Sequence, residues 1–156
     1  LFRSAGLLTP PNMGIYNTSK HAVVSLTETL YQDLRLVTDQ VSASVLCPYF
    51  VPTGISHSER NRPQGLAASQ PTVSQKIGQA MSEKAVSSGK VSAADVAQKV
   101  FDAISQDRFY VFSHPKALGN VQQRMEAILS IHQPPDPFAA RPEIGDQLRQ
   151  ELRQSP

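Results

Sequence analysis

The stretch Tyr16-Asn17-Thr18-Ser19-Lys20, followed by an apolar run over residues 21–37, determines where every other part of this chain is placed. In a helix, the tyrosine and the lysine lie on one face, one turn apart. A fixed cation favours the phenolate form of a neighbouring tyrosine, so such a pair suits general acid–base chemistry. An isolated pair of this kind also fits a solvated helix turn, and the surrounding sequence has to decide between the two interpretations.

The residues around the pair follow a helical period. One stripe at 100° per residue collects six apolar or aromatic residues, namely Tyr16, Val23, Leu26, Leu30, Leu34 and Val37. This pattern predicts a helix over residues 13–37 with Tyr16 on its buried side. The prolines at 10–11 break any earlier element, so Asn12 is predicted to be the helix N-cap.

A buried strand is predicted directly after this helix. Residues 41–47 are partly alternating and apolar, and Pro48 ends them. A helix, a short turn and a buried strand form the second half of a β-α-β unit, which implies a parallel sheet. The N-terminal end of the helix then lies at the carboxyl edge of the strands, where residues 48–53 also emerge. Open α/β sheets bind ligands along this edge.

The remainder of the chain is predicted to be one partial domain over residues 1–156. Residues 54–90 form an excursion that is either a substrate lid or an ordinary surface loop, with a helix over residues 73–86. Ser92 and Asp95 resemble a capping box that opens the next helix. An aromatic strand over residues 109–112 and a helix over residues 116–132 precede a tail, 133–156, whose end forms a charged helix or frays.

Composition excludes several classes of protein. The formal charge of +2 and the scattered basic residues argue against a nucleic-acid partner. No segment reaches the roughly 18 apolar residues of a membrane span. The single cysteine, Cys47, excludes a disulfide framework, and the four histidines lack metal-ligand spacing, so no metal site is predicted. These features predict a cytoplasmic protein.

Several spaced motifs together resemble the short-chain dehydrogenase/reductase family. They are Tyr16-x-x-x-Lys20 with its helix, Pro48-x-Phe50-Val51-x-Thr53, and Ser-Ala-Gly-Leu at 4–7, with Ser92-Ala93-Ala94-Asp95-Val96-Ala97 before the aromatic strand. The resemblance covers roughly residues 4–132. It implies an α/β fold, a Rossmann-like three-layer parallel sheet of which this chain carries the C-terminal portion only.

The resemblance also implies roles for individual residues. Tyr16 would exchange a proton with an alcohol or carbonyl substrate, and Lys20 would favour its phenolate and hydrogen-bond the nicotinamide ribose. Pro48, Val51 and Thr53 would contact the nicotinamide end of NAD or NADP. Together with Tyr16 and Lys20, these residues are the cofactor-binding candidates. The hydride chemistry itself belongs to the cofactor.

Three features depart from the family pattern. The family serine falls thirteen residues before the tyrosine, where this chain has Arg3, so Ser4 is the catalytic candidate through a one-residue shift. Tyr49 stands where the family favours glycine. No two glycines are spaced as Gly-x-Gly, so no phosphate cradle can be drawn. The chain therefore resembles the C-terminal half of the family's domain.

Two functions remain open from the sequence. The first is the catalytic half of an NAD(P)-dependent oxidoreductase that is active when complete. The second is a truncated, non-enzymatic fragment or pseudoenzyme that acts in assembly or binding. Half of a parallel sheet exposes an apolar edge. We therefore expect a partner that covers it, either the missing N-terminal half or further copies of this chain in a homo-oligomer.

Overall fold

A computed structural model of the chain describes residues 6–63, 65 and 70–153. Its centre is a helix and two short parallel strands: α1 (Gly14–Val37), β1 (Val45–Cys47) and β2 (Tyr110–Phe112). The strands pair in register from Val45 with Tyr110 to Cys47 with Phe112. The predicted parallel pairing is confirmed, although the first strand is shorter than the predicted residues 41–47.

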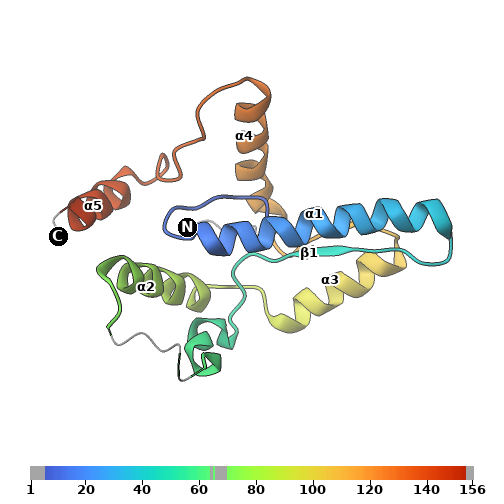
Figure 1. Cartoon of the computed structure of the whole chain (residues 1–156), viewed down its shortest axis with the longest axis horizontal. Coiled ribbons are helices and arrows are strands. Elements are labelled where there is room, and N and C mark those ends of the chain that lie inside the picture. The colour runs from blue at the N-terminus through green and yellow to red at the C-terminus, as the bar shows by residue number, and fades with distance from the viewer. Residues whose placement is uncertain (1–5, 64, 66–69, 154–156) are drawn as a thin grey trace.

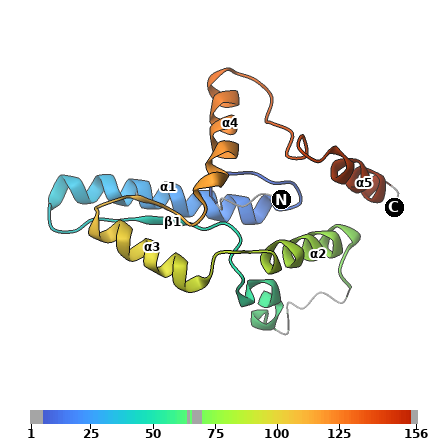
Figure 2. The ribbon, with the colours of Figure 1, turned by 180° about the vertical axis from the view of Figure 1, so that it is seen from behind.

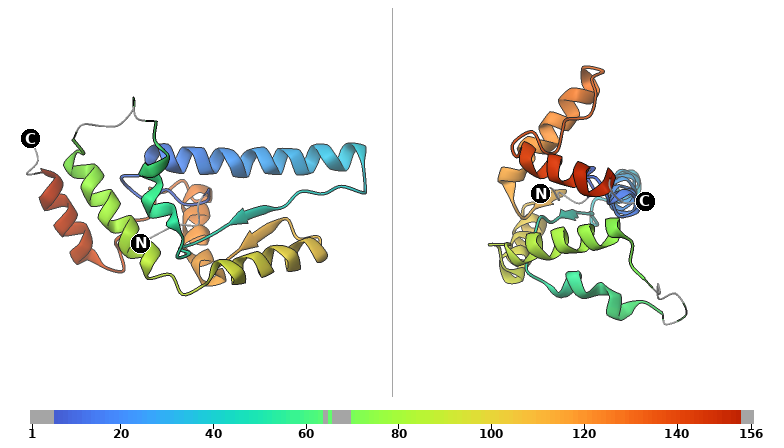
Figure 3. Two further views of the ribbon diagram at one scale, coloured as in Figure 1. Left: turned by 90° about the horizontal axis from the view of Figure 1, so that it is seen from below. Right: turned by 90° about the vertical axis from the view of Figure 1, so that its left-hand side faces the viewer.

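The first helix and the first strand run in opposite directions. Figure 1 shows β1 returning beneath α1, so the N-terminal end of α1 lies at the carboxyl end of β1. The helix α3 (Ala93–Ser105) lies on the other side of β1 in each view (Figure 3). This placement brings the start of α1 next to the chain that leaves the sheet, as the sequence predicted.

The start of α1 differs from the prediction in one residue. Met13 is the N-cap, and its side chain makes no capping hydrogen bond. Asn12 instead takes the left-handed conformation with φ of 61°, which asparagine tolerates better than most residues. Asn17 joins the first turn of the helix to the segment before it, because its Nδ2 donates to the carbonyl oxygen of Pro10 at 2.9 Å.

Two later helices start at capping boxes. Thr72 and Gln75 cap α2 (Val73–Ser87), and Ser92 and Asp95 cap α3. In each box the hydroxyl accepts from the third backbone N–H, and the side chain at that position accepts from the cap's N–H. The predicted box at Ser92 is therefore confirmed.

The remaining elements surround this centre. A 3₁₀ helix, η1 (Gly54–Asn61), follows the segment after β1, and η3 (Pro115–Ala117) leads into α4 (Leu118–Leu129). The last helix, α5 (Pro142–Arg153), follows an extended stretch and lies above the N-terminal end of α2 in Figure 2.

Two apolar clusters form the core of the described residues. Val24, Val45 and Cys47 form the first, with Leu7, Phe109 and Phe112 packed against it. Gly6 permits this packing, because its φ is +97° and a Cβ there would lie 2.5 Å from Cγ2 of Val24. The second cluster joins Phe50 to Ala85 and Val86 of α2.

The apolar stripe predicted to be buried on α1 is largely exposed. Val23, Leu26 and Leu30 are 52%, 72% and 47% exposed, whereas the adjacent Val24 is buried. The face toward the sheet is the more polar one, where Tyr110 donates to Oε1 of Glu28 at 2.6 Å. The prediction was wrong because an apolar stripe indicates that a face is covered but does not identify the covering element. Among the described residues, no element packs over this face.

The same difference recurs on α3 and α4. Val96 and Ala103 of α3 are buried, but the apolar side chains of Phe101 and Ile104 are exposed. On α4, Met125, Ile128 and Leu129 are also exposed.

Candidate functional site

The tyrosine and lysine of the opening motif lie together on the first turns of α1. Tyr16 and Lys20 are both half-buried. Nζ of Lys20 lies 5.2 Å from the centre of the Tyr16 ring, within the range of a cation–π contact. The helical spacing of four residues thus places the positive charge directly beside the phenol.

The segment that leaves β1 meets Tyr16 at one pocket. This pocket has a volume of about 250 Å³, and its walls include Tyr16, Pro48, Val51 and Thr53. Geometry therefore joins Tyr16 to the whole predicted Pro48–Thr53 set. Lys20 is not part of the pocket wall, and it reaches the site through its contact with the Tyr16 ring.

The walls of the pocket carry few polar groups and suit the binding of a flat ring. Besides the four residues above, apolar side chains line the pocket, namely Phe50, Ile55, Val86, Ala93 and Val96, together with the Tyr49 ring. The lining residues with polar side chains are Tyr16, Tyr49 and Thr53, each of which carries one hydroxyl group. Such a set suits the stacking of an aromatic heterocycle together with one or two oriented hydrogen bonds.

A hydrogen bond across the sheet holds the segment after β1. Ser113 follows β2 directly, is 2% exposed, and its Oγ accepts from the backbone N–H of Tyr49 at 2.8 Å. Because Cys47 pairs with Phe112, residues 48–49 and 113–114 leave the sheet side by side. The sequence analysis missed Ser113, although the shared carboxyl edge of the two parallel strands could have indicated it.

Aromatic rings extend this contact. The Tyr49 ring lies edge-on to Phe50, with 4.7 Å between centroids, and tilted against His114 at 5.3 Å. Nδ1 of His114 hydrogen-bonds Oγ of Ser113 at 2.8 Å. Burial, and secondarily the charge of Lys99, lowers the pKa of His114, which keeps the imidazole neutral at neutral pH. Tyr49 thus shapes one wall of the pocket.

Ser4, the remaining catalytic candidate, lies outside the described residues. Within residues 6–63, 65 and 70–153, no three histidine, cysteine, aspartate or glutamate side chains gather as metal ligands. No helix in the same ranges is long and apolar enough to cross a membrane.

Comparison with known proteins gives a consistent result. The sequence profile of the short chain dehydrogenase family matches residues 4–64. A protein named "CLA biosynthesis dehydrogenase/reductase" from Lactiplantibacillus plantarum is 32% identical over 130 residues, which are 81% of this chain and 45% of that protein.

A solved structure agrees more closely. The crystal structure of a short chain dehydrogenase/reductase from Burkholderia phymatum in complex with NAD matches with a TM-score of 0.84 and 52% sequence identity. The match covers 88% of this chain and 50% of that one. The chain thus spans about half the length of the relatives it matches.

Proposed function

The chain belongs to the short-chain dehydrogenase/reductase family, and from this premise we propose that it carries the catalytic face of an NAD(P)-dependent oxidoreductase. The reaction would interconvert an alcohol and a carbonyl compound. One observation carries the proposal: the pocket that joins Tyr16 to Pro48, Val51 and Thr53, with the Lys20 charge beside the phenol ring.

Tyr16 is the proposed proton-transfer group. In oxidation, the substrate hydroxyl gives its proton to the Tyr16 oxygen, and in reduction the Tyr16 hydroxyl returns a proton to the carbonyl oxygen. The positive charge of Lys20 offsets the negative charge that develops on the phenol when its proton leaves. The nicotinamide dinucleotide, when bound, accepts or supplies the hydride at the substrate carbon.

Pro48, Val51 and Thr53 are the proposed contacts of the nicotinamide end. The apolar walls and the Thr53 hydroxyl support this assignment. The relative from Burkholderia phymatum was crystallised with NAD, which supports a nicotinamide dinucleotide, NAD or NADP, as the cofactor. No Gly-x-Gly pair occurs in the sequence, so we propose that the dinucleotide phosphates are held by groups from a partner.

The same reasoning extends the fold. We propose that β1 and β2 belong to a larger Rossmann-like sheet with helices on both faces. Support comes from the match to half of a solved family member and from the position of β1 between α1 and α3. The rest of the sheet would come from an N-terminal half or from another copy of the chain. The free, buried Cys47 is compatible with the reducing cytoplasm that we propose.

Binding of reduced nicotinamide mononucleotide tests the proposal without the missing phosphate site. We expect its fluorescence to increase saturably on binding. The affinity for NADH should lie within a few fold of the affinity for the mononucleotide, because the adenosine end of NADH makes few contacts with this chain. Val51→Asp places a charge in the pocket wall and should abolish both signals. Val41→Asp, at an exposed position outside the pocket, should leave them unchanged. Absence of saturable binding by the wild-type chain would defeat the proposed cofactor site.

The exposed apolar residues favour a second function, in assembly or binding without catalysis. Several large apolar side chains of α1 face solvent, among them Leu26 and Leu36, which are 72% and 84% exposed. A surface of this kind marks a site of association. Sedimentation equilibrium that gives a stable oligomer, together with no mononucleotide binding, would favour this function over the oxidoreductase.

A further inference from the structure

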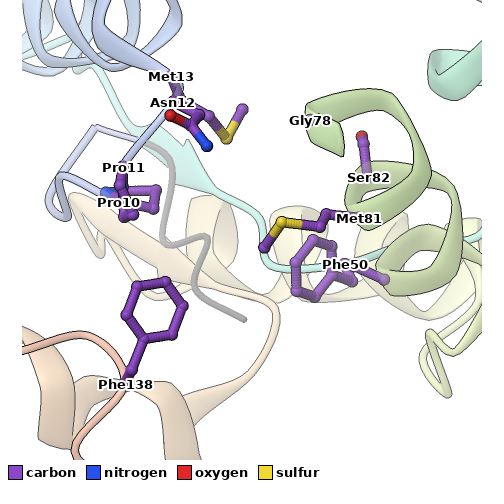
Figure 4. A pocket seen from close by; sticks show the side chains of 10 residues that line it. Pro10, Pro11, Asn12, Met13, Phe50, Gly78, Met81, Ser82 and Phe138 are labelled. Carbon is purple, nitrogen blue, oxygen red and sulfur yellow. The ribbon is translucent and has the colours of Figure 1, made fainter. Parts of the chain in front are cut away.

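A second, smaller cavity lies beside the Tyr16 pocket. It has a volume of about 50 Å³ and is formed by four parts of the chain: residues 10–13, Phe50 after β1, α2 and the tail before α5. Figure 4 shows the side chains of Met13 and Met81 extending toward one space, with the Phe50 ring next to Met81 and the Phe138 ring facing it from the tail. The sequence analysis assigned no role to these four side chains in substrate binding.

The cavity and the Tyr16 pocket share one wall. Phe50 lines both, and on α2 the neighbouring residues Ala85 and Val86 line the cavity and the pocket respectively. Met13 of the cavity precedes Tyr16 of the pocket by three residues at the start of α1. That separation is less than one helical turn, whose pitch is about 5.4 Å. The Tyr16 pocket and the cavity therefore adjoin at Phe50.

The lining of the cavity is apolar and adaptable. No charged side chain belongs to it, and its main surfaces come from two prolines, two methionines and two phenylalanines, namely Pro10, Pro11, Met13, Met81, Phe50 and Phe138. Methionine is flexible and polarisable, so its thioether adjusts to ligands of different shape. The polar side chains of the lining are Asn12 and Ser82, so a hydrated ionic group would lose its solvation here without meeting an opposite charge. The volume exceeds what one water molecule requires and fits a short hydrocarbon group.

We propose that this cavity binds the hydrocarbon end of the substrate whose oxygen meets Tyr16. The enzyme would therefore act on alcohols or carbonyl compounds that carry a short, uncharged alkyl chain, in preference to polyols or charged substrates. This substrate class rests on the oxidoreductase proposed above, whereas the binding of an alkyl group by the cavity can be tested separately from it.

The three methionines of the chain provide a direct test. Labelling them with [methyl-¹³C]methionine gives three signals, of which Met13 and Met81 report on the cavity and Met125 of α4 lies outside its lining. On titration with 2-hexanone, the Met13 and Met81 signals should shift saturably and together, while the Met125 signal stays in place. Glycerol at the same concentration should shift none of them.

A pair of glycine variants supplies the matched control. Gly78 lies in the cavity wall, and a Cβ there would meet no atom within 4 Å, as is also true of Gly119 in α4. Gly78→Leu should therefore occupy the cavity and weaken 2-hexanone binding by about tenfold or more, whereas Gly119→Leu should change it little. Circular dichroism confirms that each variant is folded before it is compared.

The possible results separate the two proposals. If Met13 and Met81 do not shift in the wild-type chain, or if all three methionine signals shift in parallel, the cavity is not the alkyl site. That result leaves mononucleotide binding, and with it the proposed function, untouched. If the two signals shift but no nicotinamide mononucleotide binds, the alkyl site stands and the oxidoreductase proposal fails.

Discussion

At the scale of single residues, the phenol oxygen of Tyr16 carries the proposed chemistry. We expect Tyr16→Phe to lower the rate of carbonyl reduction by roughly 10²–10⁴-fold, the range for loss of one general acid. Reduced mononucleotide should still bind, because the pocket walls remain. The measurement is single-turnover oxidation of NADH with 2-hexanone as the carbonyl substrate.

Tyr31 on the same helix provides the control for that substitution. Its hydroxyl accepts from Nη1 of Arg35 at 3.2 Å, and its ring packs edge-on against Phe109. Tyr31→Phe removes the same atom from α1 and should leave the rate unchanged. Equal losses in the two variants would show that the hydroxyl of Tyr16 has no special role.

Cys47 is the second residue whose environment predicts a measurement. Burial, and secondarily the charge of Glu28, raises the pKa of its thiol from 9.0 to about 11. Since the thiolate is the reactive form, we expect iodoacetamide at pH 8 to alkylate the folded chain much more slowly than the urea-unfolded chain. Rapid alkylation of the folded chain at that pH would contradict the buried position of Cys47.

The same shift makes the protein sensitive to alkali. A raised pKa means that the neutral thiol is favoured in the folded state, so its contribution is complete below pH 9 and is lost as the pH rises through about 11. Tyr110 acts in the same direction, because donating a hydrogen bond to Glu28 raises its pKa to about 12. Urea unfolding should show stability falling across this range, and Cys47→Ala should make the decline shallower.

At the scale of elements, Ser113 connects the ends of the two strands. Ser113→Ala leaves the backbone N–H of Tyr49 without its acceptor, which should cost about 1–3 kcal/mol of unfolding free energy. The segment after β1 should also shift, so the affinity for reduced nicotinamide mononucleotide should fall. Both effects are measurable on one sample by urea unfolding and by fluorescence titration.

Ser44 provides a matched control at the opposite edge of the sheet. Its Oγ donates to the carbonyl oxygen of Arg108 at 3.0 Å, so it also joins the flanks of the two strands. Ser44 is exposed, and Ser44→Ala should change stability little and mononucleotide binding not at all. If both alanine variants bind mononucleotide as the wild type does, Ser113 has a structural role only.

The capping box of α3 predicts a stability change that depends on pH. Ser92→Ala should lower the unfolding free energy by about 1 kcal/mol at pH 7. Hydrogen bonds from Ser92 lower the pKa of Asp95, so the stability they contribute is present above the ordinary pKa of aspartate and is lost as the pH falls through the lowered one. The deficit of the variant should therefore shrink in acid.

Ser105 at the end of the same helix provides the control. Its hydroxyl donates to the carbonyl oxygen of Asp102 at 3.0 Å and caps no N-terminus. Ser105→Ala should change the unfolding free energy by less than about 0.5 kcal/mol at every pH. A Ser92→Ala deficit that does not depend on pH would exclude the proposed coupling to Asp95.

At the scale of the whole molecule, local signals predicted the elements well. The period around Tyr16 gave α1 to within a residue, and Ser92 with Asp95 gave the start of α3. These features were predictable because each depends on residues within a few positions of one another. The meeting of Tyr16 with Pro48 at one pocket also followed, since a parallel β-α-β unit fixes which ends share an edge.

Contacts between distant residues were not predictable in the same way. Ser113 contacts Tyr49 because Cys47 pairs with Phe112. The register of two short strands cannot be predicted from the sequence of either strand alone. Phe138 lines the apolar cavity from the tail. Its position depends on the path of an irregular segment, which hydrophobic periodicity does not predict. Val24 is buried instead of Val23 because burial depends on which neighbour packs against the helix.

That last difference leads to a prediction about assembly. The exposed stripe of α1 includes Val23, Leu26 and Leu30, while the polar face of the helix packs on the sheet. We therefore expect the chain to associate through this stripe, because contiguous exposed apolar surface is unfavourable in water. Leu26→Lys should shift sedimentation toward the monomer without lowering stability, since Leu26 makes no buried contact in the described residues.

Gln32→Lys serves as the matched control, because Gln32 is exposed on α1 and polar already. It adds the same charge to the same helix outside the stripe and should leave the oligomer distribution unchanged. Equal dissociation in both variants would attribute the effect to net charge, and no dissociation in either would place the contact elsewhere. Dissociation by Leu26→Lys alone would show that the more apolar face of α1 binds a partner. Such binding would explain why the more polar face of the helix packs against its own sheet.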